Sequence, residues 1–284
     1  MIEPLVSIII PLYNKEKSIS STLHAVLAQS YNNLEIIVID DGSTDKSARL
    51  VSEFKDDRLN YHYQKNQGVS AARNNGVKKS HGDLIFFLDA DDYIIPDCIR
   101  ILTVPFFKDP DLGICCSSFE CTQREEGIHT DSKKQIDGRI IKNNYKSLFY
   151  QNLKIRAGNC LIRRQIVIDN PFDETLTRFE DMKAILEWIR YAKIFQMEII
   201  IMSYRKDYSA LSLPRNNHLT DYTFNLSFSG LPFWGKCQLG KLIYLGWYSY
   251  PSQRKFLIVK YRFNFIWGLI SRVLMIISRI WKNV

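Results

Sequence analysis

The chain has 284 residues, of which 46% are hydrophobic and 24% are charged, and its net charge is +8 at pH 7. This composition is ordinary for a globular protein and allows one large domain, or one domain with an appendage. The six cysteines form no C-x-x-C pair and have no histidines at ligand spacing, which argues against a zinc site or a disulfide framework. We expect them to be buried free thiols.

The first segment, MIEPLVSIIIPLYN, does not have the pattern of a secretory signal. No basic residues precede its short apolar run, and Pro11 interrupts that run. We therefore expect the protein to stay in the cytosol.

Short apolar runs alternate with helical patterns over the first hundred residues. Strands are expected at 6–10, 34–39, 59–63 and 84–88, and helices at 18–29, 44–54 and 69–79. β-branched runs separated by helices of about ten residues indicate βαβ crossovers and a mainly parallel sheet. The pattern predicts an α/β fold.

Polar residues follow three of these strands, as PLYN after the first, DDGS after the second and DADD after the fourth. Ligands of open α/β sheets bind beyond the carboxyl ends of the strands. Asp89 and Asp91 point to the same side of an extended segment, so one ion can reach both. Mg²⁺ typically takes one or two carboxylates together with phosphate oxygens, so the pattern suggests a metal-bridged diphosphate.

The alternative for such carboxylates is helix capping and turn formation. We favour capping for Asp45 and Asp97, which stand where helices are expected to begin. Asp89 and Asp91 are different, because two like charges so close together repel each other unless a cation compensates them.

Five stretches across residues 6–92 resemble a known family, the family 2 glycosyltransferases with the nucleotide-diphospho-sugar transferase fold called GT-A. In chain order these stretches are VSIIIPLYNKE, LAQSY, EIIVIDDGSTD, NQGVSAARNNG and GDLIFFLDADD. The resemblance implies a Rossmann-like, mixed and mainly parallel sheet flanked by helices. It also implies transfer of a sugar from a nucleotide-diphosphate sugar.

The resemblance further implies a role for each matching residue. Pro11 and Tyr13 would border the nucleotide base, with Glu16 in the same loop, and Asp41 would hydrogen-bond the uracil or the ribose. Arg73 would lie near the sugar-phosphate. Asp89 would lie near the ribose and the metal, and Asp91 would bind the metal directly, which would be Mg²⁺ or Mn²⁺. Two of these residues have simpler alternatives: Arg73 could pair with a surface carboxylate, and Tyr13 could pack at a strand end.

The general base is expected in the second half of the chain, in the stretch PFDETLTRFEDMKAILEWI. Its apolar residues recur at 3- and 4-residue spacing, which predicts an amphipathic helix that begins near Glu180 and Asp181. A carboxylate at a helix start is often a cap or a dipole partner. The pair also resembles the E-D pair of the family, which implies Asp181 as the base, with Glu180 as its replacement.

The resemblance implies a single displacement that inverts the anomeric centre. The chain has no Q-x-x-R-W motif and no run of membrane spans, so it is expected to add one sugar per encounter. UDP is the favoured nucleotide because the surroundings of Asp41 resemble those in uridine-binding relatives. The alternative is a non-catalytic nucleotide-sugar-binding partner subunit.

The composition changes near residue 221. We expect a catalytic domain at 1–221, with a nucleotide-sugar-binding half at 1–110 and an acceptor-binding half at 111–221, followed by a helical tail at 222–284. The tail has four of the five tryptophans and no Asp or Glu, and its positive charge exceeds that of the whole chain. Its nine basic residues are Lys236, Lys241, Arg254, Lys255, Lys260, Arg262, Arg272, Arg279 and Lys282.

The end of the tail predicts a basic amphipathic helix, too interrupted by arginines to span a bilayer. At 100° per residue, the polar side has Gly268, Ser271, Arg272, Ser278, Arg279 and Lys282. The other side is apolar and has Phe265, Trp267, Ile270, Val273, Leu274, Ile277 and Ile280.

Such a helix suits the surface of an anionic leaflet, and nucleic acid is a weaker explanation because no binding motif accompanies the charge. The alternative is that the helices pack on the catalytic domain and the basic face is merely solvated. If the membrane interpretation holds, we expect a protein peripheral to the inner face of the plasma membrane. Its acceptor would then be a lipid-linked saccharide in polysaccharide synthesis, as often in the family.

Overall fold

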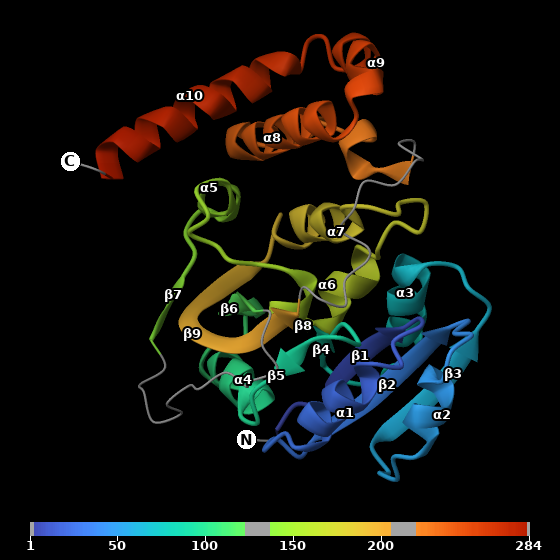
Figure 1. The fold of residues 1–284 in the computed structure, drawn as a ribbon. Coiled ribbons are helices and arrows are strands. Elements are labelled where there is room, and N and C mark those ends of the chain that lie inside the picture. Colours follow the sequence, from blue (N-terminus) through green and yellow to red (C-terminus); the bar gives the residue numbers. More distant parts are fainter. Residues whose placement is uncertain (1–2, 123–136, 206–219, 283–284) are drawn as a thin grey trace.

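The structure is a computed structural model that describes residues 3–122, 137–205 and 220–282. A sheet of nine strands runs through the described part of the chain and has helices on both faces (Figure 1). The strands are β1 (Val6–Leu12), β2 (Leu34–Asp41), β3 (Leu59–Gln64), β4 (Leu84–Phe87), β5 (Tyr93–Ile94), β6 (Leu112–Thr122), β7 (Gly138–Ile140), β8 (Cys160–Arg163) and β9 (Lys193–Arg205).

The helices differ widely in length, and the longest ones follow residue 232. They are α1 (Ile19–Leu27), α2 (Ser47–Ser52), α3 (Val69–Lys79), α4 (Cys98–Lys108), α5 (Asn144–Phe149), α6 (Arg164–Asp169), α7 (Glu180–Trp188), α8 (Phe233–Ser249), α9 (Arg254–Lys260) and α10 (Phe265–Lys282). Short 3₁₀ turns lie at Ala157–Asn159, Tyr222–Phe224 and Pro251–Gln253.

The strand order is β3-β2-β1-β4-β8-β6-β9-β5, with β7 paired to β9. The first four strands are parallel, joined by α1, α2 and α3, as the alternating sequence pattern predicted. The second half is mixed, because β8 runs antiparallel to β4 and β6 while β9 runs parallel to β6. The prediction of a mixed, mainly parallel α/β sheet is confirmed.

Both faces of the sheet are covered, so the central strands are apolar throughout rather than alternating. Ile8 and Ile10 of β1 face one core, which is completed by α1, α2 and α4. Ile9 points to the opposite core, which is completed by α3, α5, α7 and α8. This alternation along one strand is the two-residue period of β structure.

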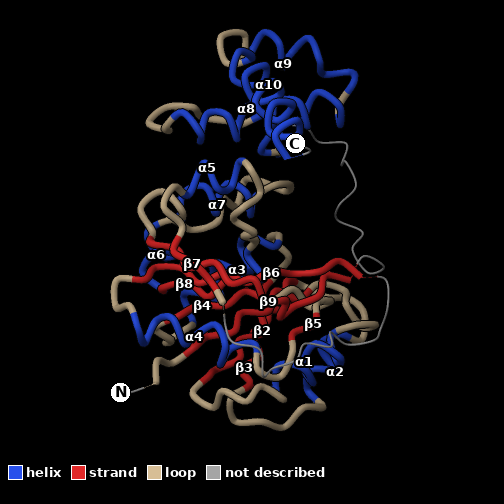
Figure 2. Tube along the Cα trace, turned by 90° about the vertical axis from the view of Figure 1, so that its left-hand side faces the viewer, coloured by secondary structure: helices blue, strands red, loops and turns tan. Residues whose placement is uncertain are grey.

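The tail joins the second core. Leu239 and Leu242 of α8 and Leu257 of α9 are buried in the same cluster as Ile9 and Phe87 of the sheet. Figure 2 shows α8, α9 and α10 as a layer separated from the sheet by α5 and α7. The tail therefore packs on the rest of the chain through α8 and α9.

Lys241 of α8 anchors this layer, because its ammonium donates to the carbonyl of Phe149 at the end of α5 and lies 3.8 Å from the Phe149 ring centroid. Burial lowers the pKa of Lys241 to about 8. Directly before the tail, Asp221 accepts from Arg178 at 2.9 Å and from the Tyr250 hydroxyl of the tail at 2.9 Å. These bonds tie the tail to the segment that precedes α7.

The helices α8 and α10 meet at glycines. A Cβ on Gly240 would lie 2.5 Å from the backbone carbon of Trp267 and 2.7 Å from the nitrogen of Gly268. The buried Ser271 hydroxyl donates to the Cys237 carbonyl at 2.6 Å. The helical pattern of the sequence places Gly268 and Ser271 on the polar side of the last helix. In the structure these small residues instead allow α10 to approach α8 closely.

We expect Gly240→Ala to separate α8 from α10. The added methyl group meets backbone rather than a flexible side chain, so overpacking should lower the free energy of unfolding by about 1–3 kcal/mol. Thermal unfolding and limited proteolysis measure this. Gly235→Ala is the matched control on the same helix, since its nearest contact is the Tyr145 side chain at 3.2 Å. Equal effects of the two substitutions would contradict the close crossing.

In the described part of the chain, we find no helix that is both long enough and apolar enough to cross a bilayer. The five cysteines for which burial is described are free and buried, as expected: Cys98, Cys115, Cys116, Cys160 and Cys237.

Candidate active site

The polar loops predicted to converge do follow neighbouring parallel strands. In the central sheet, Leu12 at the end of β1 pairs with Asp40 of β2, and Ile9 pairs with Phe87 at the end of β4. Tyr13 and Asp89 therefore follow strands that end at one edge of the sheet, and Asp41 is the last residue of a strand that ends at the same edge (Figure 1). This edge is the place where ligands of such sheets bind.

Hydrogen bonds join the loop after β1 to the loop after β2. The Asn14 side-chain oxygen accepts from the backbone nitrogen of Thr44 at 2.8 Å, and the Glu16 carboxylate accepts from that of Lys46 at 3.1 Å. Asp45 accepts from the backbone nitrogen of Ser47, the first residue of α2, at 2.9 Å, which agrees with its expected role at a helix start. The bonds of Asn14 and Glu16 thus hold the two loops together.

The other capping prediction is confirmed for position but not for bonding, since Asp97 is the N-cap residue of α4. Asp97 immediately precedes α4 but makes no side-chain bond to the backbone of that helix. Its carboxylate accepts instead from the Ser30 hydroxyl at 2.6 Å and pairs with Arg100 at 2.9 Å. A nearby hydroxyl and guanidinium compete successfully with the helix start for this carboxylate.

Pro11 is buried within β1, whereas Tyr13 just beyond the strand is 49% exposed. The exposure of Tyr13 does not support its alternative role in strand-end packing. An aromatic ring of this kind, at the edge of the sheet, is available to a planar ligand.

Asp41 is buried at the end of β2, and both of its carboxylate oxygens accept hydrogen bonds. One accepts from the backbone nitrogen of Gln67 and the side chain of Gln64, and the other from the backbone nitrogen of Gly68, all at 2.8 Å. Gly68 has a φ of +94° and directly precedes α3. Asp41 therefore fixes the start of the helix that carries Arg73, in addition to any contact with a nucleotide.

Arg73 connects the two halves of the predicted site. Its side chain is 6% exposed and reaches the Asp89 carboxylate at 2.9 Å and the Glu180 carboxylate at 3.2 Å. Burial opposes its charge, but Asp89 and Glu180 outweigh burial and raise the pKa of Arg73. The alternative of a pair with a surface carboxylate is wrong, since Arg73 is buried between two predicted site carboxylates.

Glu180 begins α7 and is followed by Asp181, as the sequence pattern predicted. Burial, and then the charge of Asp181, raise the pKa of Glu180, while Arg73 opposes this shift. The preceding Phe179 adopts φ 58° and ψ 23°, the left-handed region that bulky residues avoid. Such strain tends to be retained where a functional geometry depends on it, and here it directs the chain into the acidic pair.

Asp91 has a cationic partner that the sequence interpretation missed. The ammonium of Lys15, in the loop after β1, forms an ion pair with the Asp91 carboxylate, whose side chain is 9% exposed. Burial and the nearby Asp89 raise the pKa of Asp91, whereas Lys15 opposes this shift. The backbone of Lys15 is held by the Ser47 hydroxyl at 2.8 Å. The basic residue within the PLYNKE stretch was the available signal.

Asp89 and Asp91 have the chemistry to bind a divalent cation that a ligand also binds. Asp91 is a buried carboxylate near a second negative charge, and it is compensated by a positive group. Asp89 is 44% exposed and is open to a ligand. Among the described residues no three His, Cys, Asp or Glu side chains group as a protein-only metal site. Two carboxylates with substrate oxygens suit Mg²⁺, which seldom uses an all-protein cage.

We expect Lys15→Met to leave Asp91 short of positive charge. The variant should unfold at a lower temperature than the wild type in EDTA, and added Mn²⁺ should raise its Tm more than that of the wild type, because the cation replaces the lost ammonium. Thermal unfolding with and without Mn²⁺ measures this difference. The exposed neighbour Lys17→Met is the control. Equal Mn²⁺ shifts in all three proteins would contradict a shared position for ammonium and metal.

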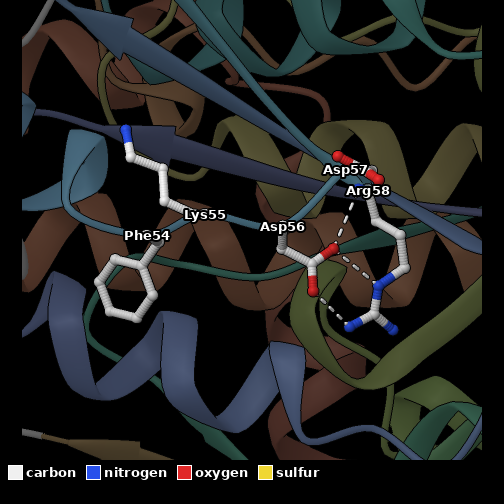
Figure 3. A pocket seen from close by; sticks show the side chains of 5 residues that line it. All are labelled: Phe54, Lys55, Asp56, Asp57 and Arg58. Carbon is white, nitrogen blue, oxygen red and sulfur yellow. Dashed lines mark hydrogen bonds and ion pairs between the residues drawn. The ribbon is translucent and has the colours of Figure 1, made fainter.

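A separate pocket of about 670 Å³ lies in the loop between α2 and β3 (Figure 3). Phe54, Lys55, Asp56, Asp57 and Arg58 line it. Its main charges neutralise each other, since Arg58 pairs with Asp56 at 2.8 Å. The pocket contains none of the predicted site residues and gives no support for a second active site.

The chain is similar to proteins of known family. The glycosyl transferase family 2 model matches residues 7–170. Putative glycosyltransferase EpsH of Bacillus subtilis is 31% identical over 166 residues, which cover 58% of this chain and 48% of EpsH. Chondroitin synthase of Escherichia coli is 33% identical over 158 residues, or 55% of this chain and 21% of the synthase. The chain thus spans about half or less of the length of these curated relatives.

Solved structures of Staphylococcus aureus TarS have the same fold. TarS 1–349 matches 88% of this chain and 74% of that chain, with a TM-score of 0.64 and 19% identity. Its complex with UDP-GlcNAc matches 84% of this chain and 66% of that chain, with a TM-score of 0.60 and 18% identity. The fold is therefore the predicted GT-A fold. Because the family model covers more than half of the chain and includes the loops of the predicted donor site, this protein is a member of glycosyl transferase family 2.

Proposed function

We propose that this glycosyltransferase moves one sugar from a UDP-sugar to a hydroxyl group of a saccharide acceptor, with inversion of the anomeric centre. The observation that carries the proposal is the position of Arg73 between Asp89 and Glu180. One guanidinium joins Asp89, a predicted donor carboxylate, to Glu180, the first residue of the acidic pair on α7. Donor and acceptor chemistry can therefore meet at a single place.

Asp181 is the better candidate for the base. The Glu180 carboxylate is held by Arg73, whereas Asp181 is the next residue and lies in the first turn of α7. Asp181 accepts the proton of the acceptor hydroxyl as that oxygen attacks the sugar. Glu180 holds Arg73 in place and is a positioning residue.

The leaving nucleoside diphosphate gains negative charge as the bond to the sugar breaks. Asp89 and Asp91 would hold Mg²⁺ or Mn²⁺, and a bound cation supplies Lewis acid stabilisation of that charge. Among the described residues, Lys15 forms an ion pair with Asp91, and Arg73 forms one with Asp89. They orient the carboxylates and add positive potential on the side of the leaving group.

Two observations on similar proteins support the choice of substrates. TarS has been solved with UDP and with UDP-GlcNAc on the same fold, which supports a UDP-sugar donor here. Chondroitin synthase, one of the similar proteins, supports polysaccharide synthesis. We propose a lipid-linked acceptor, reached by an enzyme peripheral to the cytoplasmic face of the membrane, because the tail is basic and rich in aromatic residues.

A donor screen tests the proposal. Calorimetric titrations with UDP-, GDP- and dTDP-sugars, each with and without Mn²⁺, should show binding of a UDP-sugar that depends on Mn²⁺. Release of UDP from that donor should then increase when a saccharide acceptor is added. Tighter binding of GDP- or dTDP-sugars would contradict the choice of nucleotide. Donor binding without turnover on any acceptor would favour a non-catalytic partner subunit.

A further inference from the structure

The helices α9 and α10 and the turn between them have exposed apolar side chains. Six of them are more than half exposed: Val259, Phe263, Ile266, Leu269, Val273 and Ile276. We refer to these six as the apolar ridge. Exposed apolar side chains that are contiguous rather than scattered mark an interaction surface.

The ridge is continuous along one side of the helix. Ile266, Leu269, Val273 and Ile276 follow one another at intervals of 3, 4 and 3 residues, which places them on one stripe of an α-helix. Their span of ten residues corresponds to about 15 Å of helix. Val259 and Phe263 extend the exposed surface toward α9.

The opposite side of α10 is already occupied by protein. Gly268 and Ser271 face α8, where a Cβ on Gly268 would lie 2.4 Å from the Tyr244 ring and the Ser271 hydroxyl bonds the backbone of α8. The neighbouring helix α8 thus lies behind the ridge. If α10 rotated to bury the ridge, it would lose its contact with α8. Figure 1 shows α10 beyond α8, on the side away from α5 and α7.

Exposed basic residues accompany the ridge. Lys255, Lys260, Arg262 and Arg272 are exposed on the same two helices and the turn between them. Residues 222–284 contain no Asp or Glu. A second copy of the chain that docked through this face would bring the same positive charges together, which is unfavourable. A surface with negative headgroups and an apolar interior complements both the charge and the ridge.

We propose that the apolar ridge and its flanking basic residues dock on an anionic lipid surface, with α10 lying parallel to it. The ridge enters the boundary between headgroups and acyl chains, and Lys255, Lys260, Arg262 and Arg272 meet the headgroups. The inference rests on the proposed function, because docking would bring the enzyme to a lipid-linked acceptor at that surface. Vesicle binding is nevertheless measured without donor or acceptor, so its failure and a failure of the transferase are separate results.

Vesicle flotation tests the ridge. The full chain should float with vesicles of phosphatidylglycerol and phosphatidylcholine at low salt, and only weakly with vesicles of phosphatidylcholine alone. The double variant Leu269→Ser/Val273→Ser should bind the anionic vesicles about tenfold or more weakly, because two apolar side chains no longer enter the lipid. Ile168→Ser on α6, where the isoleucine is 42% exposed, is the control and should bind like the wild type.

The charges are tested separately. Arg262→Gln and Arg272→Gln should each weaken binding to anionic vesicles by about fivefold at low salt. All the substituted residues are exposed, so Tm should stay within a few degrees of the wild-type value, and thermal unfolding checks that the variants are folded.

Three results would overturn the docking proposal. The first is equal flotation of the wild type and the Leu269→Ser/Val273→Ser variant, and the second is an equal loss in Ile168→Ser. The third is a wild-type dimer in sedimentation that this double variant makes monomeric, with no vesicle binding by either protein. That result would assign the ridge to an interface between copies of the chain.

Discussion

Asp181→Asn is expected to lower kcat by about 10²- to 10⁴-fold while leaving the Kd for the donor nearly unchanged. The amide has almost the shape of the carboxylate but cannot accept the proton of the acceptor hydroxyl. In the proposed site, the donor is bound by residues at the ends of β1, β2 and β4, and Asp181 is not one of them. Turnover with saturating donor and acceptor, together with calorimetry on the donor alone, measures the two effects separately.

Glu187→Gln is the matched control for this substitution. Glu187 lies on the same helix, is 42% exposed and pairs only loosely with Arg190 at 3.7 Å. It should keep wild-type kcat. Full activity of Asp181→Asn, or an equal loss in Glu187→Gln, would remove Asp181 from the mechanism. If Glu180→Gln lost activity while Asp181→Asn kept it, Glu180 would be assigned as the base instead.

Arg73→Met is expected to lower the free energy of unfolding by about 3–5 kcal/mol, because it leaves the largely buried Glu180 carboxylate without its cation. The methionine fills much of the volume of the arginine, so the loss of charge dominates over the loss of packing. The side chain of Glu180 is only 14% exposed and cannot recover this free energy by moving into water. Urea unfolding followed by circular dichroism measures the change.

Two further variants separate charge from packing. Arg49→Met removes an exposed guanidinium, 3.5 Å from Glu53, and should change stability by less than about 1 kcal/mol. The double variant Arg73→Met/Glu180→Gln should recover part of the loss, with a coupling free energy of about 0.5–3 kcal/mol. Additive effects of the two substitutions would show that Arg73 and Glu180 do not interact in solution.

The first half of the fold could be predicted because its signals are local. β1, β2 and β4 are short apolar runs followed by polar loops. Because the strands are parallel, all three loops begin at the same edge of the sheet. The helix at α7 could be predicted for the same reason, since its apolar residues recur with helical spacing. The mixed pairing of β6, β8 and β9 could not, because their order depends on contacts between distant segments.

Some features of the site could not be predicted, because they depend on which side chains face each other after folding. Lys15 is one of two lysines in its loop, and only the fold places it on Asp91. Arg73 was expected beside the donor, but its second partner, Glu180, is 107 residues away in the chain. The strained backbone of Phe179 has no signal in the sequence, because a phenylalanine does not favour the left-handed region.

Calorimetric titration of UDP into the wild type and into Asp91→Asn, each with Mn²⁺ and with EDTA, tests most directly whether these carboxylates form one donor site. We predict that Mn²⁺ tightens UDP binding by the wild type at least about tenfold over EDTA, and that Asp91→Asn loses most of this gain. Binding of equal strength in all four titrations would contradict a donor site built on Asp89, Asp91 and a shared cation.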